Sequence, residues 1–163
     1  MLKQLSFTKR APDVATPESL KALETNLNIQ LPPAFVEFCF RWNGGFASKE
    51  NMFYPVPPVF KEFYDEYKKS KGVYVDTLFG ATEQLPYCGL LKECASLGDF
   101  SRLYIPITVD LLGDQAVLRT DSPMGLVYWA DHTLWEAPDK PCLIPIADDL
   151  ESFYNSLTVD PDR

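Results

Sequence analysis

Apolar residues recur at helical spacing near the start of the chain. Thr16 and Pro17 provide an N-cap and a proline for the first turn, and Leu20, Leu23 and Leu27 then fall on one face. This spacing predicts a short amphipathic helix that begins at Pro17 and buries its leucine face.

Three later segments have the same periodicity. The first follows Leu31-Pro32-Pro33 and stops at Asn43-Gly44-Gly45, which is a typical helix C-terminal signal. The second covers residues 60–67. The third covers residues 150–157 and follows Asp148-Asp149, whose carboxylates suit the positive end of a helix dipole. We therefore expect a helical hairpin near the start, an isolated helix, and a helix that closes the chain.

The second half of the chain changes to short runs rich in β-branched and aromatic residues, which predict strands. These runs are 73–75, 77–79, 103–108, 115–120, 126–130 and 143–146. The turn-rich segment 121–125 predicts an antiparallel hairpin over Gln115–Ala130. No repeat or flexible linker interrupts the order of helices, strands and helix. We predict a single α+β domain over residues 1–163, with a mainly antiparallel sheet and helices packed on one face.

The segment 46–74 is expected to be an excursion from this domain. Three closely spaced prolines favour an exposed loop ahead of the isolated helix. Loops on a rigid scaffold commonly carry recognition residues. Phe46, Phe53 and Tyr54 are therefore candidates for contact with a partner.

Charge narrows the classes of partner. The 163 residues include 15 Lys and Arg against 23 Asp and Glu, which gives a formal net charge of −8. Residues 101–163 carry 4 basic against 11 acidic side chains, so most of the excess lies in the last third. A charge of this sign repels nucleic-acid phosphates and anionic lipid, so we expect a basic protein partner instead. No apolar run approaches the roughly eighteen residues of a bilayer span, and the first ten residues lack a signal-peptide core, so a cytoplasmic protein is predicted.

Candidate catalytic and metal-binding residues are few. The four cysteines, at 39, 88, 94 and 142, form no CxxC pair, and His132 is the single histidine that could complete a metal set. Cys39 and Cys142 lie in apolar surroundings and are expected to be buried free thiols. His132 has no flanking motif that would supply a nucleophile or an orienting group, so we expect it to have a structural role. We expect no enzyme activity, no metal and no cofactor.

Five motifs, taken in order, resemble the SUKH superfamily (Smi/Knr type). They are Leu31–Phe38 running into Trp42–Gly45, Leu78–Gly80, Tyr104–Ile107 followed by Gly113-Asp114, Gly125–Trp129 leading into Asp131-His132, and Ile146–Phe153. The resemblance spans most of the chain and implies a noncatalytic α+β domain. For bacterial members it implies an immunity protein of a polymorphic toxin or contact-dependent inhibition system, which neutralises a secreted toxin, frequently a nuclease or deaminase. The chain departs from the family pattern at 116–121 and has a longer 46–74 segment, which leaves the partner's identity open.

An acidic surface could block such a toxin directly. A nuclease active site is basic because it attracts phosphates, and complementary charge speeds association and helps to select the partner. The residues that we expect to form this surface are Asp110, Asp114, Asp121, Asp131 and Glu136, with Trp135 as an aromatic anchor. We expect a monomer or weak dimer. The alternative is an intracellular regulatory or scaffold module that binds a protein other than a toxin.

Overall fold

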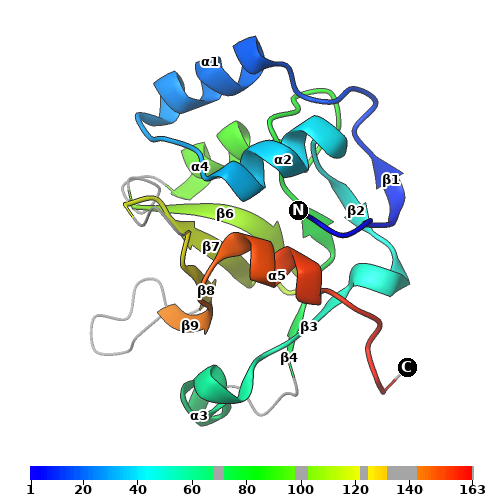
Figure 1. The fold of residues 1–163 in the computed structure, drawn as a ribbon, viewed down its shortest axis with the longest axis vertical. Helices are drawn as coiled ribbons and strands as arrows, with labels where there is room; N and C mark the ends of the chain where they lie inside the picture. Colours follow the sequence, from blue (N-terminus) through cyan, green and yellow to red (C-terminus); the bar gives the residue numbers. More distant parts are fainter. Residues whose placement is uncertain (68–71, 98–102, 122–124, 132–142, 163) are drawn as a thin grey trace.

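The computed structural model describes residues 1–67, 72–97, 103–121, 125–131 and 143–162 (Figure 1). Within these residues the helices are α1 (Pro17–Leu27), α2 (Pro33–Arg41), α3 (Pro58–Tyr67), α4 (Leu90–Leu97) and α5 (Leu150–Ser156), with a short 3-10 helix η1 (Lys49–Asn51). The strands are β1 (Phe7–Arg10), β2 (Gly45–Ala47), β3 (Phe53–Pro55), β4 (Gly72–Tyr74), β5 (Thr77–Leu78), β6 (Tyr104–Val109), β7 (Gln115–Arg119), β8 (Val127–Ala130) and β9 (Leu143–Ala147).

One seven-stranded sheet, in the order β1-β2-β5-β6-β7-β8-β9, organises the molecule. Each neighbouring pair in this order is antiparallel. The smaller β3–β4 pair is also antiparallel. The predicted α+β class with a mainly antiparallel sheet is confirmed, and so is the hairpin over Gln115–Ala130.

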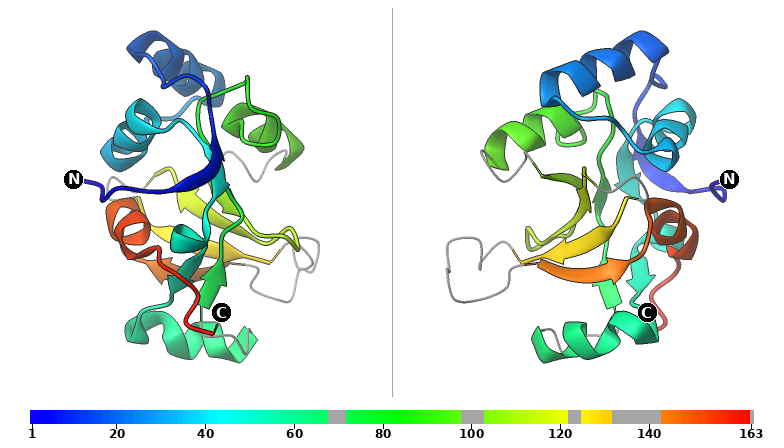
Figure 2. Two further views of the ribbon diagram at one scale, coloured as in Figure 1. Left: turned by 90° about the vertical axis from the view of Figure 1, so that its right-hand side faces the viewer. Right: turned by 60° about the vertical axis from the view of Figure 1, so that its left-hand side comes forward.

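The helices occupy distinct places around this sheet. Helices α2 and α5 are in contact and lie side by side in front of the sheet, while α1 and α3 lie at opposite ends of the long axis (Figures 1 and 2). Helix α3 packs against β9, and α4 packs against β6 and α1. The Thr16 cap predicted from sequence forms as expected, and Asp149, which was expected only to suit the helix dipole, also acts as an N-cap. Thr16 accepts from the backbone of Ser19 at the start of α1, and Asp149 accepts from the backbone of Ser152 at the start of α5.

Aromatic side chains fill the space between α2, α5 and β3. The rings of Phe38 and Tyr154 stack with their centroids 4.9 Å apart, and the ring centroids of Tyr54 and Phe153 are 4.7 Å apart. All four side chains are at most 1% exposed. The two ring pairs therefore join the helical layer to the smaller sheet.

The prediction that residues 46–74 form an exposed loop is wrong for its aromatic residues. Phe53 and Tyr54 are 3% and 1% exposed, and Phe46 is half-buried in β2. Phe53 exchanges two backbone hydrogen bonds with Thr158, of 3.1 and 2.7 Å, and the Tyr54 hydroxyl donates to the Ile146 carbonyl at 2.8 Å. Pairing of β3 with β4 and with the C-terminal segment withdraws these side chains from any partner.

The cysteines among the described residues have buried thiols. Cys39, Cys88 and Cys94 are free and buried, which confirms the prediction for Cys39, while Cys142 lies outside the described residues. Burial raises the pKa of the Cys39 thiol to about 12. These three thiols therefore act as small apolar side chains at neutral pH.

Replacing each of two buried tyrosines by phenylalanine should change the free energy of unfolding in opposite directions. The Tyr154 hydroxyl is buried and has no hydrogen-bond partner in the part of the chain that the structure describes, whereas the Tyr54 hydroxyl is bonded to Ile146. Burial of the unpaired Tyr154 hydroxyl carries a desolvation free energy that no hydrogen bond offsets. Y154F should therefore raise the free energy of unfolding by about 1 kcal/mol. Y54F should lower it by about 1 kcal/mol because a made bond is lost. Urea unfolding checks both, and a change of the same sign in the two variants would contradict this assignment.

Candidate functional site

The predicted acidic residues lie at two ends of β7. Asp110 and Asp114 flank the turn between β6 and β7, and Asp131 follows Ala130, which pairs with Gln115 at the same end. Asp121 lies beyond the other end of this strand, whose five residues are about 17 Å long. The structure therefore brings three of the four described acids toward one end of the sheet. Trp135 and Glu136, together with His132, lie outside the described residues.

Asp114 is not a surface residue. It is only 4% exposed, so its carboxylate cannot form part of an accessible acidic rim. Its place directly before β7, whose first four residues are buried, draws it into the protein. The charge count along the sequence could not reveal this burial.

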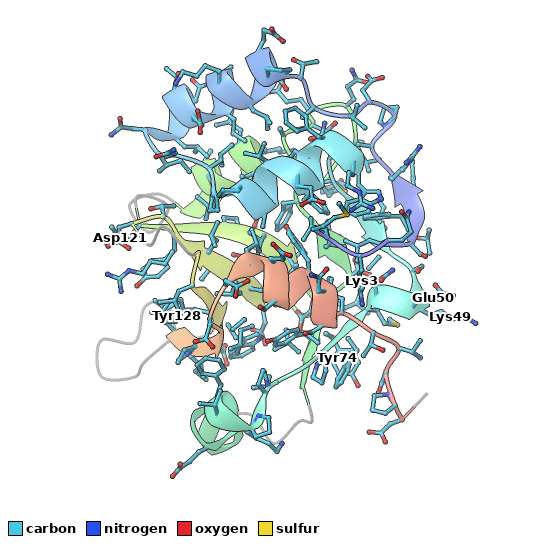
Figure 3. All side chains as sticks on the ribbon, in the orientation of Figure 1. Lys3, Lys49, Glu50, Tyr74, Asp121 and Tyr128 are labelled. Atoms are coloured by element: carbon cyan, nitrogen blue, oxygen red, sulfur yellow. The ribbon has the colours of Figure 1, made fainter. Side chains whose placement is uncertain are left out.

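Asp121 is exposed, but its charge is already matched by a neighbouring cation. The Arg119 guanidinium donates to it in a two-point contact, with Nε–Oδ1 at 2.5 Å and Nη2–Oδ2 at 3.0 Å. These bonds from Arg119 lower the pKa of Asp121. Figure 3 shows Asp121 at the edge of the molecule, on the same side as Tyr128.

Asp110 builds the turn that follows β6. Its Oδ1 accepts from the backbone N–H groups of Leu112 at 2.8 Å and Asp114 at 2.9 Å. The Asp110 N–H donates to the Asp114 carbonyl at 2.9 Å, and Gly113 closes the turn with a φ of +96°, which favours glycine. Burial raises the pKa of Asp110. The carboxylate therefore has a structural task as well as a charge.

This turn holds two adjacent leucines in solvent. Leu111 and Leu112 are 80% and 74% exposed. Figure 2 (left) shows the turn, between β6 and β7, on the side of the molecule away from α2 and α5. The signal for these leucines lies in Asp110–Asp114 (DLLGD), a turn motif with two apolar residues at its tip, whereas the sequence prediction rested on its acids alone.

A groove of about 220 Å³ lies beside these leucines. Residues 110–112 form one side, and Met52, Tyr74, Val75 and Asp76 form the other. Tyr74 is 38% exposed, and its hydroxyl donates to Asp160 at 2.8 Å, which fixes the ring (Figure 3). We call the turn and this groove together the leucine turn site.

A larger hollow of about 570 Å³ lies between the start of α2 and α5, and it is a weaker candidate. Its two acids are already engaged. Asp149 accepts two hydrogen bonds from Ser152, and Glu151 pairs with the N-terminal amine at 2.5 Å. The leucine turn site combines exposed apolar area with carboxylates that no cation neutralises within the described residues.

The sequence of this chain matches the model of one known protein family. The sequence model of the SMI1 / KNR4 family (SUKH-1) matches residues 14–156, from the segment before α1 to the end of α5. The chain belongs to the SUKH-1 family. Neither the comparison with curated proteins nor that with solved structures finds a match.

SUKH-1 domains are generally non-enzymatic immunity or binding domains, and membership is consistent with an immunity-like role. Among the described residues of this SUKH-1 chain, no group of three or more His, Cys, Asp or Glu side chains could hold a metal ion. No helix in the described ranges has the length and apolar character that crossing a membrane requires.

The role of Asp110 in the turn gives a direct test. D110A removes the acceptor of two backbone N–H groups and should lower the free energy of unfolding by about 1–2 kcal/mol. D110N keeps an oxygen at the same place and should cost less than D110A. Urea unfolding measures both, with D121A as the control because the Asp121 carboxylate pairs with the Arg119 side chain and not with the β6–β7 turn. Equal losses for D110A and D110N would show that charge, rather than the hydrogen bonds, holds the turn.

Proposed function

We propose that this SUKH-1 protein is an immunity protein that binds a secreted toxin domain and neutralises it by direct contact through the leucine turn site. The observation that carries the proposal is a hydrogen-bonded turn that keeps two leucines 80% and 74% exposed. Contiguous exposed apolar area is one mark of an interaction surface. The family membership supports the same role.

Binding through this turn is energetically reasonable. Burying each leucine in an interface contributes about 1.5–3 kcal/mol relative to leaving it in water. The turn is already closed by the bonds to Asp110, so little conformational entropy is lost when it docks. A small site of this kind can therefore supply the centre of an interface.

The acidic charge of the protein speeds its association with a basic partner. The net charge of −8 attracts a basic toxin, and a nuclease that binds phosphates would be basic around its active site. Asp110 and Asp131 lie at the turn end of the sheet and form part of this surface in our proposal. Trp135 and Glu136 remain proposed contacts beyond the described residues, and we assign the protein to the cytoplasm of the cell that it protects.

Substitution of the two leucines tests the proposal. Where a neighbouring gene encodes a secreted protein, its C-terminal domain is the partner to test, expressed with and without this protein. L111S/L112S should weaken binding by at least about 30-fold and abolish rescue of the cells, because the buried apolar area is lost. V14S/V59S is the matched control, since Val14 and Val59 are 51% and 70% exposed and lie away from the turn.

Rescue by the control and not by the leucine variant, with both folded, is the result that supports the proposal. Equal rescue by both variants would place the interface elsewhere. No rescue by the unaltered, folded protein would overturn the immunity function and favour a regulatory or scaffold module.

Steering by charge gives a separate prediction. The association rate with a basic toxin domain should fall at least about 5-fold between about 50 and 500 mM salt, while the dissociation rate changes little. Stopped-flow or surface-plasmon measurements of the two rate constants check this. An association rate that does not depend on salt would contradict a role for the acidic surface.

A further inference from the structure

The groove of the leucine turn site contains two carboxylates fixed on neighbouring strands. Thr77 of β5 pairs with Val109 of β6, so the next positions outward are Asp76 and Asp110. The Asp76 N–H donates to the Val109 carbonyl at 2.9 Å, which extends the pairing to this point. Both acids are half-buried and both line the groove. The antiparallel register therefore sets their positions.

Among the described residues, no lysine or arginine lines the groove or lies within 4 Å of Asp76 or Asp110. The Asp76 side chain accepts a hydrogen bond from the Thr77 hydroxyl at 3.2 Å. Asp110 Oδ1 accepts two turn bonds, and because a carboxylate has about four acceptor sites on its two oxygens, capacity remains for an outside donor.

The remaining walls of the groove are apolar. Leu111, Leu112 and Tyr74 present exposed side chains, and Met52 and Val75 complete the wall. A volume of about 220 Å³ is below the roughly 300–1,000 Å³ of small-molecule sites and suits a single long side chain. Lysine and arginine combine an apolar stem with a cation, and the face of a tyrosine ring attracts such a cation.

We propose that this groove binds a lysine or arginine side chain of the partner, with the alkyl stem against Leu111, Leu112 and Tyr74 and the cation at Asp76 and Asp110. The inference deepens the proposed function, because it names what the site recognises on a basic toxin. It specifies a basic residue displayed beside apolar ones.

Other occupants fit the same walls less well. An apolar side chain would cover two carboxylates without pairing them, which is unfavourable. A second copy of the turn would bring like charges together. Calcium requires about six to eight oxygen ligands, far more than two carboxylates between apolar walls provide.

The test uses defined probes and the unaltered full chain. Methyl-labelled protein is titrated with pentylguanidinium, which has both stem and cation, and with 1-hexanol, which has a stem of similar length and no charge. Pentylguanidinium should shift the methyl signals of Leu111 and Leu112 and bind at least about 5-fold more tightly than hexanol. D76N and D76N/D110N should reduce this preference to less than about 2-fold, because asparagine keeps the shape and removes the charge.

D121N is the matched control, since Asp121 is an exposed acid at the other end of β7 that Arg119 already pairs. It should leave the preference unchanged. Equal affinity for the two probes, or shifts confined to methyl groups outside the groove, would overturn the inference. Rescue of cells from the toxin combined with equal probe affinity would overturn this inference and leave the proposed function standing. Selective binding of pentylguanidinium without rescue would support the inference and contradict the proposed function.

Discussion

The antiparallel register of β5, β6 and β7 is the constraint on which both the core and the candidate site depend. It pairs Thr77 with Val109 and Val109 with Gln115, so the segment before β5 and the turn after β6 meet at one edge. On the core side it aligns Ile105 with Leu118 at 0% exposure. A slip by one residue would exchange the faces of each strand and move every side chain of the groove. Core packing and site geometry are therefore specified together.

The turn after β6 departs from the usual distribution of residues in a way that the proposed function would explain. Turns normally carry polar side chains at their tips, yet Leu111 and Leu112 remain in water. The bonds to Asp110 hold them there, and burial of that carboxylate raises its pKa. Natural sequences break local rules mainly at functional positions. A cation from a partner would stabilise the charged form of Asp110 and offset this cost.

Much of the fold could be predicted from the sequence because periodicity and capping residues are local signals. Thr16 and Asp149 cap the helices that their spacing predicts, and the hairpin over residues 115–130 forms. Strands β1, β2 and β3 were missed because their sequences, FTKR, GFA and FYP, contain no run of β-branched residues. Within the candidate site, counting acids could not distinguish a buried Asp114, a paired Asp121 and a turn-forming Asp110. The burial of Asp114 arises from tertiary packing, whereas the Arg119–Asp121 pair and the Asp110 turn bonds are local contacts whose signal in the sequence a count of charges does not use.

Amide hydrogen exchange of this protein, free and in the presence of the toxin domain that it is proposed to bind, tests the role of the leucine turn site most directly. Binding should slow exchange in residues 74–76 and 110–114 and leave α1 and α3, at the two ends of the molecule, unchanged. Protection confined to α1, α3 or the α2–α5 face, with the turn exchanging as in the free protein, would contradict the assignment of this turn as the interface.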